Sequence, residues 1–226
     1  MKMRGLIGLA VCVIAVVGIA WAGTASAAPI SIANGDFNNP SPGAYDAFAW
    51  GTVPSWTVTS APLNGDYYAP QTTARVGWFP PATPYVQMDT WNGIVSVSQT
   101  LADVETPNTT YTFSVDSEVG PGYGHGNGNV TFQVLAGATP IITISVPDTA
   151  LNSAISWYGD NFGTLTGTFT SGASVTGEPL TVVLSSATMT RIDVDNVKLD
   201  AVTTPEPATM ALLAIGGIGA LLRRRK

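Results

Sequence analysis

The sequence has almost no cysteine, histidine or basic charge. Its 226 residues include one cysteine, one histidine and nine Lys+Arg, against 15 Asp+Glu. Cys12 lies in the N-terminal apolar segment, so the chain beyond it has no thiol for a disulfide, a nucleophile or a metal ligand. The lone histidine, His125, cannot form the usual zinc set without cysteine partners. A domain of this composition must be held together by its own hydrophobic core.

Basic residues are scarcest between residues 28 and 204, where only Arg75, Arg191 and Lys198 occur. The same span contains 14 of the 15 acidic residues, which gives it a net charge of −11. Because almost nothing in it neutralises phosphate groups, we exclude nucleic acid as a partner. Solubility there must come from hydroxyl groups, since the span contains 26 Thr and 15 Ser, and threonine is favoured on strand surfaces.

Signatures of catalysis are also missing. The chain has no Gly-x-Ser-x-Gly, no His-Glu-x-x-His and no phosphate loop. A glycosidase needs two facing carboxyl groups. The glutamates of the central span, Glu105, Glu118 and Glu178, stand in apparent loops without a pairing motif. Aspartates remain open as catalytic acids, but the residues predict a protein that is not an enzyme and name no catalytic residue.

The N-terminus has the three parts of a secretory signal peptide over residues 1–27. Lys2 and Arg4 form a charged start, residues 5–22 are apolar, and Ala25-Ser26-Ala27 is a small-residue cleavage site. The alternative is an N-terminal membrane anchor, because an apolar run of about 18 residues can nearly span a bilayer. The Ala-Ser-Ala ending favours cleavage by signal peptidase.

The C-terminus, residues 203–226, also has three parts. Apolar residues 208–222 would make a helix of about 22 Å. This is short for a hydrocarbon core of about 30 Å, and the basic end beyond it should stay in the cytoplasm. The flanking parts are Pro205, Glu206 and Pro207 on one side and Arg223, Arg224, Arg225 and Lys226 on the other.

This tail resembles the PEP-CTERM sorting signal of bacteria that make extracellular polysaccharide. The resemblance implies a transmembrane sorting helix and a partner, exosortase, which is a membrane-embedded protease that cleaves near Pro205, Glu206 and Pro207. It also implies a membrane-held precursor, from which the body passes to the cell envelope or the extracellular matrix. An ordinary tail anchor is the alternative.

Between the two ends, residues 28–202 are expected to form one β domain. No stretch has a convincing 3.6-residue period, whereas short runs with strand-like alternation recur and are separated by Gly, Pro and Asn clusters. The pattern predicts an all-β fold, a single antiparallel β-sandwich, flanked by an N-terminal signal helix and the C-terminal transmembrane helix. The clearest runs are residues 94–101, 110–116, 130–135, 141–146, 164–170, 180–185 and 191–199.

The order of several short motifs resembles the galactose-binding-like jelly roll of carbohydrate-binding modules. That family opens with an Asn-Gly-(Asp/Gly)-Phe-Glu segment and closes with an Asp-(Asp/Asn)-Val strand, but here Asn38 and Asn39 follow the phenylalanine. The matching motifs are Asn34-Gly35-Asp36-Phe37, Pro54-Ser55-Trp56, residues 97–101 and 107–114, Trp157, residues 167–170 and residues 192–199.

Many proteins with that jelly roll bind a structural Ca²⁺ between the N-terminal loop and the last strand. Calcium requires six to eight oxygen ligands. Asp36 falls in the first motif and Asp195 in the last, and Asp193 shares a strand face with Asp195 by the period of two. The resemblance therefore implies a calcium site at Asp36, Asp193 and Asp195. The alternative is an Asx turn at Asp36 and solvated aspartates.

Aromatic residues crowd into a proline-rich region, where prolines predict loops rather than central strands. Exposed rings on loops are suited to stack on the apolar faces of sugars, and we predict them to bind a ligand. The alternative is that they cover the ends of the sandwich, while Trp56 and Trp157 are expected in the core. The predicted ligand-binding rings are Tyr67, Tyr68, Trp78, Tyr85 and Trp91.

Taken with the resemblances, the sequence predicts an exported, exosortase-processed protein that binds carbohydrate in an exopolysaccharide or biofilm matrix. The alternative is a structural or adhesive matrix protein without a specific small ligand. Apart from the calcium site, no cofactor is expected. The expected partners are signal peptidase, exosortase, the membrane before processing, and extracellular polysaccharide.

Overall fold

The computed structural model describes residues 26–37, 53–62, 73–77, 85–89, 93–120, 128–152, 161–186 and 191–204. Ala28–Ala201 form one compact unit. The described residues form eleven strands and one short 3-10 helix, η1 (Asp148–Ala150). The strands are β1 (Ala28–Ile30), β2 (Thr57–Pro62), β3 (Thr73–Gly77), β4 (Tyr85–Asp89), β5 (Gly93–Val104), β6 (Thr109–Val119), β7 (Asn129–Ala136), β8 (Thr139–Pro147), β9 (Gly163–Thr170), β10 (Pro179–Ser185) and β11 (Arg191–Thr203).

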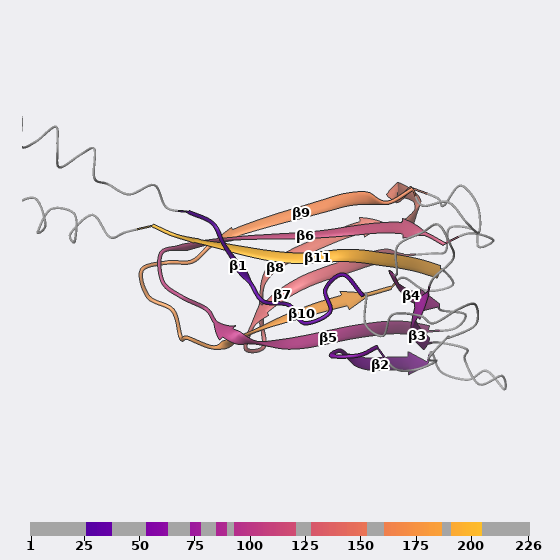
Figure 1. Cartoon of the computed structure of the whole chain (residues 1–226), viewed down its shortest axis with the longest axis horizontal. Coiled ribbons are helices and arrows are strands. Elements are labelled where there is room, and N and C mark those ends of the chain that lie inside the picture. Colours follow the sequence, from indigo (N-terminus) through magenta and orange to yellow (C-terminus); the bar gives the residue numbers. More distant parts are fainter. Residues whose placement is uncertain are drawn as a thin grey trace, which may run out of the picture. The chain divides into compact units, whose positions relative to one another are not determined.

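The strands form two open sheets (Figure 1). One has the order β3-β4-β11-β6-β9, with β1 also paired to β11, and the other has the order β2-β5-β10-β7-β8. The strand pairs whose register is defined are antiparallel. From β4 onward the chain crosses repeatedly between the sheets, which makes the fold jelly-roll-like. The all-β prediction is therefore confirmed.

Alternation of side chains between core and surface explains why these sequences form strands. Along β7, Val130, Phe132 and Val134 are fully buried, and the residues between them are partly exposed. The same alternation holds in β6 up to Val115 and throughout β10. Each run predicted from sequence to be a strand lies within one of β5 to β11.

The core lies between the two sheets and is built from branched aliphatic and aromatic side chains. Members include Phe113, Val115 and Ile192 from one sheet and Phe132 and Leu184 from the other. Gly167 of β9 allows the sheets to approach closely here. A Cβ atom at this position would lie 2.7 Å from the Cγ2 atom of Ile142.

Glu118 is a correction to the sequence analysis. It was predicted in a loop, but β6 continues through Val119, and Glu118 is 2% exposed. The first Gly-Pro pair that ends a strand comes only at residues 120–121. The strand alternation places Glu118 on the face opposite Val115 and Val119, which belong to the core.

The two predicted flanking helices lie outside the described residues and stay predictions. Residues 1–25 and 205–226 carry the signal and sorting segments. In the part of the chain that the structure describes, no helix is long and apolar enough to cross a membrane.

Tyr111→Phe is expected to destabilise the domain without disturbing its packing. The Tyr111 ring is 1% exposed, and its hydroxyl oxygen accepts a 2.7 Å hydrogen bond from the backbone N–H of Thr106. Removing the hydroxyl leaves that N–H without this partner, which should cost about 1 kcal/mol. The melting temperature should fall by about 2–4 °C.

The control for this variant is Thr110→Val. It removes one hydroxyl of the exposed Thr110–Thr170 pair, whose oxygens are 2.9 Å apart, and should change stability by no more than about 0.5 kcal/mol. Equal melting of Tyr111→Phe and the wild type would show that the Thr106 hydrogen bond is not stabilising.

Candidate functional site

The N-terminal segment, Ala28–Phe37, lies along one edge of β11. Ala28–Ile30 pair with residues 199–201, and the Val197 N–H donates a 2.9 Å hydrogen bond to the Gly35 carbonyl oxygen. Between these two contacts the N-terminal segment runs five residues, from Ile30 to Gly35, whereas β11 runs only two, from Leu199 to Val197. Because the N-terminal segment is longer, residues 31–34 bow away from the strand. The bow leaves a groove between the two segments.

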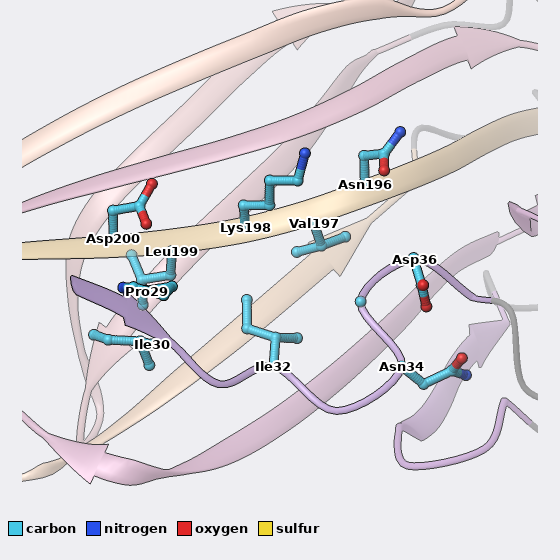
Figure 2. A pocket seen from close by; sticks show the side chains of 11 residues that line it. Pro29, Ile30, Ile32, Asn34, Asp36, Asn196, Val197, Lys198, Leu199 and Asp200 are labelled. Carbon is cyan, nitrogen blue, oxygen red and sulfur yellow. The ribbon is translucent and has the colours of Figure 1, made fainter. Parts of the chain in front are cut away.

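The groove has a volume of about 380 Å³ (Figure 2). Ile32 points from the N-terminal segment toward Val197, whereas Asn196, Lys198 and Asp200 stand on one side of β11. The groove therefore has an apolar floor and a polar rim. It is lined by Pro29, Ile30, Ile32, Asn34, Gly35, Asp36, Asn196, Val197, Lys198, Leu199 and Asp200.

The Asn34-Gly35-Asp36-Phe37 motif forms a tight turn against β11. Asn34 and Phe37 have φ angles of 53° and 48°, a region that asparagine tolerates better than most residues. A Cβ atom on Gly35 would lie 2.7 Å from the backbone oxygen of Val197. Glycine is therefore required at position 35 because two backbones meet there.

Gln99 holds this turn to the opposite sheet. It occupies an inward position of β5 and is 8% exposed. Its Oε1 atom accepts from the Ala33 N–H at 2.8 Å, and its Nε2 atom donates to the carbonyl oxygens of Ala33 and Ser55, both at 2.9 Å. One amide thus satisfies three backbone groups at positions where neither segment belongs to a strand.

The alternation of core-facing and outward-facing residues in β11 changes phase at Asn196. Ile192 and Val194 belong to the core before this point, and Val197 and Leu199 belong to it afterwards. Asn196 has a φ angle of 49°, so the backbone makes a bulge that shifts the alternation by one residue. As a result, Asp193 and Asp195 lie on the outer face, away from the core.

Three carboxyl groups are buried on this outer face, and we call them the outer acidic cluster. Glu118 on β6 is 2% exposed, Asp193 is 1% exposed and Asp195 is 3% exposed. β11 lies between β4 and β6 in the sheet. Because Asp193 pairs with Gln87 and Val194 with Val86, the register brings Asp195 to the level of Tyr85.

Two residues just before β9 contact Glu118 and Tyr85. The Asn161 backbone N–H donates a 2.6 Å hydrogen bond to Oε2 of Glu118. The Phe162 ring lies 6.2 Å from the Tyr85 ring at an angle of 58°, and Tyr85 is 4% exposed. A backbone amide thus binds Glu118, and the Tyr85–Phe162 pair lies at the level of Asp195 in the sheet.

Asp116 connects the cluster to neighbouring strands. Its Oδ1 atom accepts from the Thr164 hydroxyl at 2.5 Å, and its Oδ2 atom accepts from Nδ2 of Asn196 at 3.0 Å. The Asn196 backbone N–H in turn donates to Oδ1 of Asp195 at 2.7 Å. Side chains from β6, β9 and β11 therefore fix the bulge beside Asp195.

The three predicted calcium ligands occupy two different environments. Asp193 and Asp195 are buried in β11, whereas Asp36 is exposed in the turn, and its carboxylate points away from β11 in the view of Figure 2. Among the described residues, no three His, Cys, Asp or Glu side chains gather as a metal centre requires. Calcium binding at these residues stays a prediction.

Of the five rings predicted to bind a ligand, the structure describes Tyr85. It is buried beside Phe162 rather than exposed on a loop. Tyr67, Tyr68, Trp78 and Trp91 lie outside the described residues. Trp56 is 7% exposed in the core, as expected, and its ring is 5.6 Å from that of Phe37.

Sequence reasoning missed Asp116, Phe162 and Asn196. One signal was available for Asn196, because the apolar residues of the last strand change phase between Val194 and Val197. A change of phase within a strand indicates a bulge. No local pattern marks Asp116 or Phe162, because their roles depend on residues 40 or more positions away along the chain.

These features define a class of protein: a cysteine-free, two-sheet β domain with carboxyl groups buried on the outer face of one sheet under an aromatic border. Comparison with known families makes this specific. The chain belongs to the HpiC1-like cyclase family, whose model matches residues 28–200. Residues 203–226 match the PEP-CTERM protein-sorting motif. No curated protein matches the chain.

Several solved structures are similar to this chain. The Stig cyclase Fisc from Fischerella sp. TAU, in complex with (3Z)-3-(1-methyl-2-pyrrolidinylidene)-3H-indole, is 24% identical with a TM-score of 0.60, covering 80% of this chain and 100% of that one. A cyclase from the same organism in complex with 4-(1H-indol-3-yl)butan-2-one is 22% identical with a TM-score of 0.61, covering 79% and 100%. A carbohydrate-binding module of family 4 is 19% identical with a TM-score of 0.42, covering 76% and 99%.

The comparisons confirm one prediction and overturn another. The PEP-CTERM prediction is confirmed, which identifies an exported protein that is sorted by exosortase. The expectation that the protein is not an enzyme is wrong, because the cyclase family model covers 28–200. The expectation depended on the absence of a few local catalytic motifs, and that absence excludes only the reactions that those motifs serve.

Proposed function

We propose that the body of this exported protein is a cyclase that closes a ring in a small aromatic molecule at the outer acidic cluster. The observation that carries the proposal is the burial of Glu118, Asp193 and Asp195 beside the Tyr85–Phe162 pair, in a chain of a cyclase family. The two similar cyclases hold indole compounds. We therefore propose an indole-type or similarly electron-rich aromatic substrate.

General acid chemistry is the mechanism that these residues support. Burial disfavours the ionised form of a carboxyl group, and in this proposal one of the three buried acids carries a proton at neutral pH. In the proposed step the acid protonates a double bond of the substrate, and a second double bond attacks the resulting cation. The new carbon–carbon bond closes the ring, and a proton returns to the carboxylate. Such proton transfer typically contributes 10²–10⁴-fold to the rate.

The test uses 4-(1H-indol-3-yl)butan-2-one as a probe of the full chain in detergent, with binding followed by calorimetry. The wild type should bind it saturably, and Phe162→Ala should weaken binding roughly 2- to 10-fold through loss of an aromatic contact. Asp195→Asn should also weaken it. Asp103→Asn is the matched control, because Asp103 is exposed on the other sheet. Absence of binding, or equal affinity in all four proteins, would refute the proposal.

Carbohydrate binding in the extracellular matrix stays a prediction from the sequence. It depends on Tyr67, Tyr68, Trp78 and Trp91. If it is right, Trp78→Ala and Trp91→Ala should each lose about 1–3 kcal/mol of affinity for the host's polysaccharide, by analogy with base stacking. These variants should keep the melting temperature of the wild type. Trp56→Ala should instead unfold the core, since Trp56 is 7% exposed.

Calcium at Asp36, Asp193 and Asp195 is tested by chelation. A ligand that binds only the native state stabilises it by RT ln(1 + [L]/Kd), so EDTA should lower the melting temperature relative to millimolar calcium. Identical melting temperatures in both conditions would show that calcium does not bind at these residues. Because a carboxylate that ligates calcium is ionised, a site at Asp193 and Asp195 would leave Glu118 as the acid of the cluster.

Processing of the tail is expected to require both of its ends. We keep the predicted division into a signal peptide (1–27), a body (28–202) and a sorting signal (203–226). Glu206→Ala, or removal of residues 223–226, should leave a membrane-held precursor of full tail length, because each change removes one part of the motif. Immunoblotting of cell and medium fractions checks this. Release of normal-sized protein by both variants would contradict it, and Thr204→Ser is the control.

A further inference from the structure

A line of hydrogen-bonded side chains crosses the outer face of the six-stranded sheet. Asp116 is its centre, since one carboxylate oxygen accepts from Thr164 of β9 and the other from Asn196 of β11. β6 therefore holds both of its neighbours through a single side chain. Beyond Asn196 the line reaches Asp195, whose Oδ1 accepts the Asn196 backbone N–H at 2.7 Å.

The Asn196 bulge is a conformation that needs support. Its φ angle of 49° is uncommon for a residue other than glycine. Such conformations persist only when the surrounding structure determines them, and they concentrate at functional sites. The hydrogen bond from Nδ2 to Asp116 pins the side chain of the bulged residue. The backbone N–H of the same residue donates to the Asp195 carboxyl group, so both hydrogen bonds depend on the conformation of Asn196.

We propose that Asp116 is a positioning residue for Asp195: by holding Asn196 it fixes the bulge of β11, and the bulge sets the direction of the Asp195 carboxyl group within the outer acidic cluster. This inference rests on the proposed function, in which that cluster binds and protonates the substrate. Asp116 itself is partly exposed, whereas Asp195 is 3% exposed. Asp116 thus acts from the margin of the site rather than within it.

The proposal predicts different effects for three substitutions. Asp116→Ala removes both acceptor oxygens, so it can hold neither Thr164 nor Asn196. Asn196→Gly tolerates the left-handed backbone but removes the side-chain link, without changing any charge. Thr164→Val leaves the bond between Asp116 and Asn196 intact. The effects should therefore be strong in the first two variants and weak in the third.

The experiment combines two measurements on the full chain in detergent micelles. Hydrogen exchange of the residue-196 amide, followed by NMR, reports the N–H bond to Asp195 without any ligand. Affinity for 4-(1H-indol-3-yl)butan-2-one reports whether the proposed binding site is intact. In Asp116→Ala and Asn196→Gly we expect exchange at least tenfold faster and affinity several-fold weaker. Ser114→Ala, on the same face of β6 and opposite Thr166, is the control and should change neither.

The outcomes separate this inference from the proposed function. Unchanged exchange at residue 196 in Asp116→Ala would overturn the positioning role, whatever the probe does. Faster exchange with weaker probe binding supports it. Faster exchange with probe affinity equal to the wild type overturns the link to the site. Failure of the wild type to bind the probe would refute the proposed function, while the exchange result would still decide whether Asp116 holds Asn196.

Discussion

Gly35→Ala should lower the stability of the domain by about 2–4 kcal/mol, although it adds a single methyl group. The added Cβ would lie 2.7 Å from the Val197 backbone oxygen, so either the turn or β11 must move. Inserting a methyl group where nothing can yield costs about 1–3 kcal/mol. The 2.9 Å hydrogen bond from Val197 to the Gly35 oxygen would also weaken, at about 0.5–1.5 kcal/mol.

Thermal unfolding of the purified chain measures this effect. For a domain of this size, each 1 kcal/mol shifts the melting temperature by about 2–4 °C, so a fall of about 5–15 °C is expected. Gly172→Ala is the matched control, because a Cβ there meets nothing closer than the Ser174 oxygen at 3.8 Å. Equal melting of Gly35→Ala and Gly172→Ala would mean that the N-terminal turn is not held against β11.

Gln99→Leu should destabilise the domain by about 3 kcal/mol while keeping nearly the same side-chain volume. The substitution leaves the N–H and C=O of Ala33 and the C=O of Ser55 without the amide that now binds them. Each stranded polar group costs about 1–3 kcal/mol when buried, and these bonds are partly buried, so values at the lower end apply. Gln99→Glu should also destabilise, because it loses both donors and places a carboxyl group beside two carbonyl oxygens.

Gln133→Leu is the control for Gln99→Leu. Gln133 lies on β7, and its amide donates to the Thr143 hydroxyl on the exposed face, so its loss should cost no more than about 0.5 kcal/mol. Chemical denaturation of both variants gives the comparison. If Gln99→Leu and Gln133→Leu have the same free energy of unfolding, the Gln99 amide is not what fastens the turn.

Gly35 and Gln99 hold the same turn from opposite sides, and this has a further consequence. Substitutions that share a structural element are not additive. The double variant Gly35→Ala/Gln99→Leu should therefore lose less stability than the sum of the two single variants. This non-additivity would show that β11 and β5 act on one unit, the N-terminal turn.

Local features of the sequence determined the class of fold and the sorting of the chain. Alternation in residues such as 130–135 and 180–185 predicted β7 and β10, because a strand with one buried face shows its period of two directly in the sequence. The tail from Thr203 to Lys226 was recognisable because its three parts are contiguous and in fixed order. Neither inference required knowledge of distant contacts.

The tertiary structure decided which residues join in the candidate site. The sequence placed Asp193 and Asp195 on one face of the last strand, but only the sheet order brings β6, with Glu118, beside that strand. Glu118, Asp193 and Asp195 come from two strands and are all buried, and the Glu118 carboxylate accepts from the Asn161 backbone N–H, which lies outside both strands. The sequence placed Glu118 in a loop because one charged residue near a Gly-Pro pair looks the same in a loop and at the end of a strand. Whether a carboxyl group is solvated or buried depends on what covers it, and a covering segment leaves no mark on the alternation of the strand beneath it.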